Sequence, residues 1–278
     1  MEVRSFTFAL LCFVWLLLLV LSPLSAREIR CLGLMAAMDF ECDYLLDSLC
    51  QRRTSCLAGR EFHRGLIYGN DTVVVCSGIG KVNAAMTAQL LITHYRVDAI
   101  IMVGVAGGLG EEIEYGDVVI AKDLVQHDYS RVYPDRTSPG RLKIAKDGKW
   151  QHTKSFGSDA DILKKLRAAA ARSDFGGKSP LSQELPEIFV GKIATGDQFI
   201  ASREVHRWII DVHGAIAVEM ESAAMAQVAE TFSIPFGVVR AISDVSNSNS
   251  AFHYHLNKGR SARHAQQLIL NYIYDGIN

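Results

Sequence analysis

Short apolar runs alternate with amphipathic segments along most of the chain. Residues 99–105 are a continuous apolar stretch, which is typical of a central strand that is covered on both faces, and 29–34 and 236–242 are mainly apolar runs of strand length. Between such runs, apolar residues recur at intervals of three and four, which predicts helices that bury one side. Repeated strand and helix in this order predict an α/β fold with a mostly parallel sheet between helices.

The expected elements can be placed along the numbering. Strands are expected at residues 29–34, 62–68, 72–76, 99–105, 118–121, 188–194, 215–218 and 236–242, and helices at 39–49, 81–95, 160–172, 203–212, 222–231 and 261–274. The helix at 81–95 is expected to bury one apolar face, formed by Val82, Met86, Leu90 and Leu91. Residues 129–152 are polar, basic and rich in turn formers, so we expect an excursion from the core there.

The first residues differ from this pattern. Arg4 precedes an apolar stretch at 6–21, and residues 22–26 (SPLSA) follow it. The stretch is shorter than the ~20 residues that a membrane-spanning helix needs, and small residues stand where a signal peptidase cleaves. We therefore predict a signal peptide at 1–26 and one folded domain at 27–278 that is exported, whether periplasmic, secreted or anchored on the outer side of a membrane. An uncleaved N-terminal anchor is the alternative, and it would be the protein's membrane contact.

Composition narrows the class of protein further. The chain is 49% hydrophobic and 21% charged, as expected of a globular domain, and its net charge is -1. No dense run of Lys or Arg could follow a phosphate backbone, so no nucleic-acid partner is expected. Five cysteines lie beyond the signal segment, an odd number that cannot all pair internally. One disulfide, such as Cys50 with Cys56, and buried free thiols both remain open.

Polar residues and glycines gather where predicted strands end. The segments are 37–41 (AMDFE), 105–108 (VAGG), 240–244 (RAISD) and 218–222 (VEMES). Sites in folds of this kind lie at the carboxyl ends of strands, so these segments are expected to meet. Each is weak evidence alone, because acidic residues near helix starts are commonly caps, and the glycines of VAGG lack the G-x-G-x-x-G pattern of a dinucleotide site.

Taken together and in this order, these segments resemble the purine nucleoside phosphorylase and nucleosidase superfamily, and in particular the 5'-methylthioadenosine/S-adenosylhomocysteine nucleosidases. The resemblance spans residues 29–245 and is weakest at 129–186. It is carried by residues 33–41 (GLMAAMDFE), 78–82 (GIGKV), 104–109 (GVAGGL), 115–119 (YGDVV), 195–200 (TGDQFI), 217–221 (AVEME) and 235–244 (PFGVVRAISD).

The resemblance implies the fold, the reaction and the assembly. The fold is a single-domain three-layer αβα sandwich around a mostly parallel, mixed central sheet. The reaction is hydrolysis of the N-glycosidic bond of an adenine nucleoside, with release of adenine. The enzymes of this family need no metal or organic cofactor, bind a small-molecule nucleoside and form homodimers.

The same resemblance implies a role for each matching residue. Glu41 orients the attacking water beside Arg240, and Asp244 protonates or hydrogen-bonds N7 of the leaving purine. The substrate-binding residues are Phe199, which stacks on the purine, Ile200, whose backbone meets the purine edge, Met220 and Glu221, which hold the ribose, Ser243, which assists Asp244, and Ala106 and Gly107 of the glycine turn.

The chemistry of the reaction asks for the same residue types. Breaking an N-glycosidic bond builds positive charge on the sugar and negative charge on the departing base. An acid at the base nitrogen stabilises the leaving group, and general acid catalysis of this kind contributes roughly 10² to 10⁴ in rate. A second carboxylate on the other side can accept a proton from water and favour the cationic sugar. Asp244 and Glu41 are the candidates.

Two departures from the family pattern concern the substrate. Val105 stands where these nucleosidases place a hydroxyl residue before Ala-Gly-Gly. The pair His127-Asp128 is kept, but residues 129–133 (YSRVY) replace the segment that helps to build the 5' pocket, so the 5' substituent stays undetermined. His253 and His255 suggest a metal at first sight, but without a third ligand nearby we assign them to a loop or a helix start.

Two competing functions remain. A phosphate-dependent phosphorylase needs a cationic anion site by the first strand, whereas this chain offers Asp39 and Glu41 there, so hydrolysis is favoured. A catalytically inactive exported storage or binding relative is the other alternative. It is disfavoured because Glu41, Glu221 and Asp244 are all present.

Overall fold

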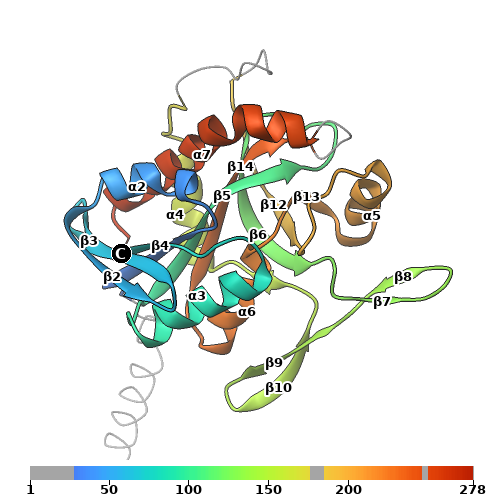
Figure 1. Ribbon diagram of the computed structural model, residues 1–278, viewed down its shortest axis with the longest axis horizontal. Helices are drawn as coiled ribbons and strands as arrows, with labels where there is room; N and C mark the ends of the chain where they lie inside the picture. The colour runs from blue at the N-terminus through green and yellow to red at the C-terminus, as the bar shows by residue number, and fades with distance from the viewer. Residues whose placement is uncertain (1–27, 176–184, 246–249, 278) are drawn as a thin grey trace, which may run out of the picture.

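The computed structural model describes residues 28–175, 185–245 and 250–277. The predicted signal peptide at 1–26 and its cleavage point near Arg27 lie outside the described residues. Within the described ranges, no helix combines the length and the apolar character needed to cross a membrane. The described residues form an α/β fold, as predicted (Figure 1).

One large sheet carries the fold. Nine of its strands follow the order β11-β6-β12-β13-β5-β1-β4-β3-β2, and β14 pairs with both β5 and β6. The strands are β1 (Cys31–Ala36), β2 (Cys50–Leu57), β3 (Arg60–Ile67), β4 (Asn70–Cys76), β5 (Ala99–Gly108), β6 (Val118–Gln126), β11 (Phe156–Gly157), β12 (Ile188–Thr195), β13 (Ala215–Glu219) and β14 (Phe236–Asp244).

The pairing of β14 closes part of this sheet into a ring. Following the pairs from β5 through β14, β6, β12 and β13 leads back to β5. The sheet is mixed, because β1, β4, β5 and β14 pair in parallel while β13 meets β5, and β14 meets β6, in antiparallel register. The central strand β5 is therefore buried along its whole length.

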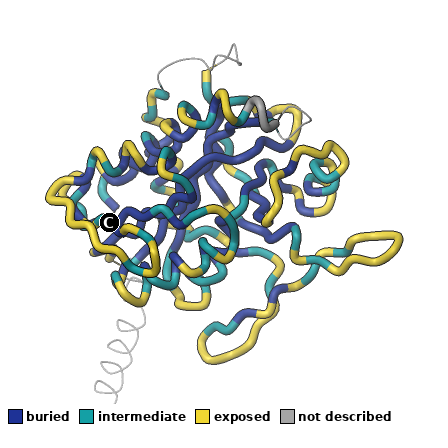
Figure 2. Tube along the Cα trace, in the orientation of Figure 1, coloured by how far each residue is buried: buried dark blue, intermediate teal, exposed yellow. Residues whose placement is uncertain are grey.

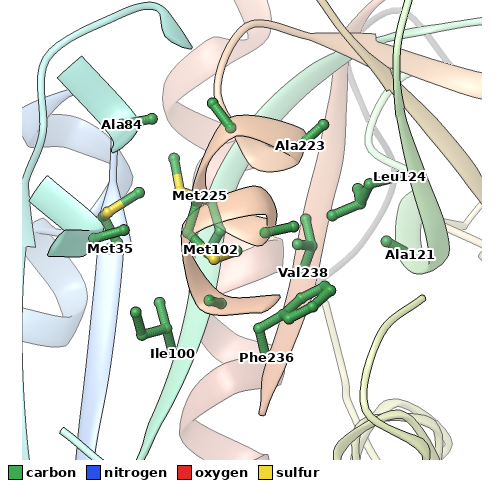
Figure 3. Packing of buried hydrophobic residues seen from close by; sticks show 14 of the residues in the cluster. Met35, Ala84, Ile100, Met102, Ala121, Leu124, Ala223, Met225, Phe236 and Val238 are labelled. Carbon is green, nitrogen blue, oxygen red and sulfur yellow. The ribbon is translucent and has the colours of Figure 1, made fainter. Parts of the chain in front are cut away.

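Helices cover both faces of the sheet, as Figure 1 shows. Helices α3 (Lys81–Thr93) and α6 (Ser222–Thr231) pack on one face, and α2 (Asp43–Asp47), α4 (Ala160–Ala170) and α7 (Ser250–Tyr274) pack on the other, with α5 (Arg203–His213) beside β12 and β13. Strand residues alternate between the two layers: Ile100 and Met102 of β5 face α3 and α6, whereas Ile101 faces the opposite helices. Figure 3 shows Met102 in the first layer with Ala84 of α3 and Met225 of α6.

Helix α3 buries a different face from the predicted one. Val82 and Met86 are exposed, by 77% and 40%, whereas the small residues Ala84 and Ala88 are buried with Leu91. The prediction for Val82 and Met86 was wrong because α3 packs closely on α6, and close approach of two helices favours small side chains at the contact. Apolar spacing alone cannot tell which of two apolar stripes a helix buries.

Other differences concern the ends of elements. The predicted helix at 39–49 is divided into a 3-10 turn at Asp39–Glu41 and the short helix α2. The helix predicted at 261–274 is longer in the structure, where α7 already starts at Ser250. Strand β2 was missed, since seven of its eight residues are exposed and it has no apolar pattern.

Residues 129–152 form an excursion from the core, as predicted. Two hairpins stand off the main sheet, β7 (Ser130–Val132) with β8 (Thr137–Pro139) and β9 (Leu142–Lys146) with β10 (Lys149–Thr153). They project from the body of the molecule and are largely exposed (Figures 1 and 2). The second hairpin is attached to α6 by the ion pair of Lys146 with Glu230, at 2.5 Å.

The structure distinguishes between the two states that the sequence left open for the cysteines, one disulfide or buried free thiols. All five cysteines of the described residues are free, so the disulfide of Cys50 with Cys56 is not formed in this structure. Cys31 and Cys42 are buried, as the free-thiol alternative requires, but Cys50 and Cys56 are exposed on β2.

Candidate active site

A cavity of about 330 Å³ lies where β1, β5, β12, β13 and β14 end. This is the expected edge of an α/β sheet, because the loops that follow parallel strands meet there. All but one of the predicted site residues line it: Glu41, Ala106, Gly107, Phe199, Ile200, Met220, Glu221, Ser243 and Asp244. Arg240, the exception, is fully buried and hydrogen-bonded to the backbone of Val105, which also lines the cavity.

Three carboxylates surround the buried guanidinium of Arg240. Its Nη2 donates to Glu219 and to Oε2 of Glu221, the latter at 3.3 Å, and its Nη1 lies 3.8 Å from Oε1 of Glu41. Burial works against the charged form, but the carboxylates outweigh it and hold the pKa of Arg240 above its ordinary value. The cluster therefore contains one permanent positive charge among three acidic groups.

Glu219 is the residue of this cluster to which the sequence assigned no role. It accepts hydrogen bonds from the backbone N–H groups of Glu221 and Ser222, at 3.0 and 2.9 Å, and from the hydroxyls of Thr195 and Ser222. These bonds satisfy N–H groups at the start of α6 that have no partner within the helix, and they orient Glu219 toward Arg240. The only signal in the sequence was the pair of carboxylates around Met220, of which one had been assigned to ribose.

The carboxylate of Glu41 is held by backbone on two sides. Oε2 accepts the N–H groups of Ala37 and Met38, both at 2.9 Å, and Oε1 accepts the N–H of Val105 at 2.8 Å. Burial raises the pKa of Glu41, and Arg240 together with these N–H groups limits the rise. Although the side chain of Val105 is apolar, its backbone still positions this carboxylate.

A different segment of the chain holds Glu221 in place. Its Oε1 accepts the N–H of Gly80 at 2.8 Å, so the GIGKV segment contributes a backbone donor to the site. Gly80 has a φ of 96°, a conformation that favours glycine. Burial, and then the charge of Glu219, raise the pKa of Glu221 to about 7.

Asp244 and Ser243 end strand β14 beside the glycine turn. Asp244 is 3% exposed and lies in register with Gly107 of β5. The hydroxyl of Ser243 lies 3.0 Å from Oδ1 of Asp244 and 3.3 Å from the carbonyl oxygen of Ala106, and it can donate to either. Glu41 thus accepts a hydrogen bond from Val105, and Ser243, which contacts Asp244, lies beside Ala106, the next residue of the same strand.

Aromatic side chains form the apolar wall of the cavity. Phe199 is half-exposed, and its ring meets that of Tyr254 edge-on at 6.1 Å. The hydroxyl of Tyr254 donates to the sulfur of Met38 at 3.2 Å, and burial raises the pKa of Tyr254 to about 12. The sequence missed Tyr254 because the predicted helix began only at residue 261.

The histidines beside Tyr254 lie near the start of α7, which is one of the two places predicted for them; the side chain of His253 lies outside the described residues. Among the described side chains, no cluster of His, Cys, Asp and Glu is arranged to bind a metal ion.

A sequence model of the phosphorylase superfamily matches residues 32–273 of the chain. Two curated proteins named 5'-methylthioadenosine/S-adenosylhomocysteine nucleosidase are similar to it. That of Tolumonas auensis is 33% identical over 222 residues, which cover 79% of this chain and 88% of the relative. That of Bacillus cereus is 32% identical over 240 residues, which cover 86% of this chain and 96% of the relative.

Solved structures of nucleosidases with the same name are also similar. The protein from Neisseria meningitidis, in complex with methylthio-immucillin-A, gives a TM-score of 0.76 at 26% identity and covers 89% of this chain and 100% of its own. The protein from S. pneumoniae, with the transition-state inhibitor MT-ImmA, gives a TM-score of 0.73 at 32% identity and covers 88% of this chain and 98% of its own.

Substitution of Gly104 tests the close packing of the cluster. A Cβ at this position would overlap Nη1 of Arg240 and Oε1 of Glu41, neither of which can move without losing its partners. We expect Gly104→Ala to lower the free energy of unfolding by about 1–3 kcal/mol and to abolish turnover of an adenine nucleoside. The control is Gly157→Ala in β11, where a Cβ meets no neighbour within 4 Å. The measurements are denaturant unfolding and nucleosidase activity of both variants. Near-normal turnover by Gly104→Ala would contradict the packing argument.

Proposed function

The chain belongs to the phosphorylase superfamily, and from the placement of Glu41 and Asp244 around one cavity we propose that it hydrolyses the N-glycosidic bond of an adenine nucleoside. The substrates are 5'-methylthioadenosine, S-adenosylhomocysteine or both, and adenine is released. The names of relatives that are 32–33% identical over most of the chain support these substrates. The observation that carries the proposal is that one cavity contains two buried carboxyl groups, one for the leaving purine and one for the attacking water.

The base leaves on the side of Asp244. As the bond breaks, N7 of the purine gains electron density and accepts a proton or a hydrogen bond from the carboxyl group. Ser243 lies 3.0 Å from Oδ1 of Asp244 and fixes its orientation. Phe199 supplies a flat apolar surface on which the purine stacks, and Ile200 lies next to it in the lining.

Water attacks on the side of Glu41. The three backbone N–H bonds fix the carboxylate in one orientation, so little reorganisation is needed at the moment of reaction. A raised pKa makes the carboxylate a better acceptor for the proton of the water. The negative charge that Glu41 shares with Glu219 and Glu221 also favours the cationic sugar of the transition state.

Glu221 and Met220 hold the ribose between these two groups. Glu221 is anchored by the N–H of Gly80 and by Arg240, and it lines the cavity where the sugar hydroxyls must lie. A carboxylate accepts hydrogen bonds from two neighbouring hydroxyls, which fixes the anomeric carbon relative to Glu41 and Asp244.

Hydrolysis is favoured over phosphorolysis by the charge of the site. A phosphate ion needs a surplus of positive charge or N–H donors that point at it. Here Arg240 is already paired with three carboxylates, and the N–H groups near β1 are bonded to Glu41. The net negative charge of the site would repel phosphate, whereas it does not repel a neutral water molecule.

We expect Asp244→Asn to keep the fold and to lose most of the activity toward 5'-methylthioadenosine. An amide cannot donate an acidic proton to N7, and general acid catalysis contributes roughly 10² or more. Initial rates of adenine release at equal protein concentration, with circular dichroism as the control for folding, measure the effect. Turnover above about a tenth of the wild-type rate would remove Asp244 from the role of general acid.

We expect Glu41→Gln to bind nucleoside without turning it over, because Phe199, Met220 and Glu221 remain in place. Isothermal calorimetry should detect the complex while no adenine is formed. Since both oxygens of Glu41 accept N–H groups, the amide nitrogen of Gln must face at least one donor, so a melting curve accompanies the experiment. If a folded variant lost binding together with activity, Glu41 would be a ribose-binding or structural residue.

We further propose that the protein is a homodimer. The exposed apolar residues Ile79, Val82 and Met86 lie at the start of α3, and Ile79 also lines the active-site cavity. A second copy of the chain would cover this apolar surface beside the site. Static light scattering should give a dimer, and Val82→Lys with Met86→Lys should give a monomer, whereas Val212→Lys on α5, where Val212 is similarly exposed, should not. A wild-type monomer with full activity would contradict the proposal.

The site of action is proposed to be outside the cytoplasm, with a mature chain that begins near Arg27. The apolar stretch at 6–21 and the small residues that follow it support cleavage by a signal peptidase. N-terminal sequencing of protein recovered from the exported fraction is the measurement. A chain that still begins at Met1 would instead indicate an uncleaved anchor.

A further inference from the structure

A second cavity adjoins the active site. Its volume is about 950 Å³, and it shares Met38 and Ile79 with the active-site cavity. The carboxylates that line the first cavity are buried, whereas the charged and polar side chains of the second are exposed or half-buried: Asp39, Arg60, Glu61, His63 and Asn83. The two cavities therefore border each other at Met38 and Ile79, and the second is called the polar groove below.

The roles proposed for the groups in the first cavity indicate which part of a nucleoside faces this groove. The purine belongs beside Phe199 and Asp244, and the ribose beside Glu221. Met38 and Ile79 are then left for the substituent on the 5' carbon. A substituent longer than a methylthio group would pass between these two side chains into the polar groove.

Arg60 brings an uncompensated positive charge to the groove. Its guanidinium donates to the carbonyl oxygens of Ser77 and Ala58, to Oδ1 of Asn83 and to the sulfur of Met86, at 3.0, 2.9, 2.8 and 3.9 Å. All of these acceptors are neutral, and within the described ranges no carboxylate pairs with Arg60. Arginine has five N–H donors, so a donor remains for a ligand.

Asp39 brings the opposite charge. It is exposed in the turn that precedes Glu41, directly after Met38, and the described part of the chain contains no ion pair to its carboxylate. The other charged side chains of the groove are Glu61 and His63, which lie 3.8 Å apart. Burial lowers the pKa of His63, so His63 carries no charge at neutral pH to compensate Glu61. The groove thus offers the cation of Arg60 together with the carboxylates of Asp39 and Glu61, and these two signs of charge complement a zwitterion.

We propose that this groove is a subsite for the amino-acid end of S-adenosylhomocysteine, with the α-carboxylate on Arg60 and the α-ammonium on Asp39. This inference rests on the proposed nucleosidase function and adds a substrate preference to it. 5'-Methylthioadenosine ends at Met38 and Ile79 and does not reach the groove. Arg60 and Asp39 therefore determine how well the longer substrate is used, without touching the reacting atoms.

Steady-state kinetics with both nucleosides test the subsite. For Arg60→Met, which keeps the aliphatic length and removes the charge, kcat/KM for S-adenosylhomocysteine should fall about tenfold, as loss of a charge-assisted hydrogen bond predicts. The value for 5'-methylthioadenosine should stay within about twofold, because the subsite adds only one contact that this substrate lacks. The matched control is Arg64→Met on the same strand, where Arg64 pairs with Asp71 outside the groove, and it should change neither value.

A purely structural role for Arg60 gives a different result. Arg60 connects the start of β3 to the loop before α3, so a variant that only disturbs this loop would lower kcat/KM equally for both substrates, and that outcome overturns the proposal. Asp39→Asn should likewise act on S-adenosylhomocysteine alone.

A measurement on the unmutated protein avoids the question of folding altogether. Methylation of the α-carboxyl group of S-adenosylhomocysteine removes the charge that Arg60 would bind. The methyl ester should therefore show a kcat/KM about tenfold below that of the free acid, and a difference that shrinks in high salt. Equal use of ester and acid overturns the subsite. Absence of adenine release from every nucleoside would overturn the proposed function instead, so the two failures are distinguishable.

Discussion

The buried charge of Arg240 is the constraint on which the site depends. A guanidinium without access to water is tolerated only when carboxylates and hydrogen-bond acceptors surround it. Glu219, at the end of β13, supplies the strongest pairing and also satisfies the first N–H groups of α6. Glu221 and Glu41 complete the compensation from the two other sides. Because Glu41 follows β1 whereas Glu219 and Glu221 lie at the end of β13, the buried cation of β14 links the carboxyl ends of three strands.

Strand β5 connects this charged cluster to the residues that line the cavity. Its backbone at Gly104 leaves room for Arg240 and Glu41, the N–H of Val105 binds Glu41, and the carbonyl of Ala106 lies beside Ser243. The spacing between Glu41 and Asp244, the two proposed catalytic carboxyl groups, is therefore set by main chain. Main-chain contacts do not depend on a particular side chain at residue 105, which explains how the site keeps its geometry with valine there.

Catalysis and the choice of 5' substituent use separate regions. Glu41 and Asp244, which we propose to act on the glycosidic bond, are buried, whereas Asp39 and Arg60 lie in the adjoining polar groove, and Asp39 is exposed. In addition, the apolar start of α3 lies at the boundary between the two cavities, so a partner subunit in the proposed dimer would border the same groove.

The sequence alone determined the fold class and most strands and helices, because buried strands leave mainly apolar runs. The motif segments at strand ends, and their resemblance to a known family, gave the residues around the cavity. The sequence could not determine which stripe of α3 is buried, since Val82 and Leu91 are equally apolar and only the contact with α6 distinguishes them. Nor could it identify Glu219 as the partner of Arg240, or bring Tyr254 and Arg60 to the cavities. These residues are far apart in the chain, and their roles arise from distances that exist only after the strands have paired.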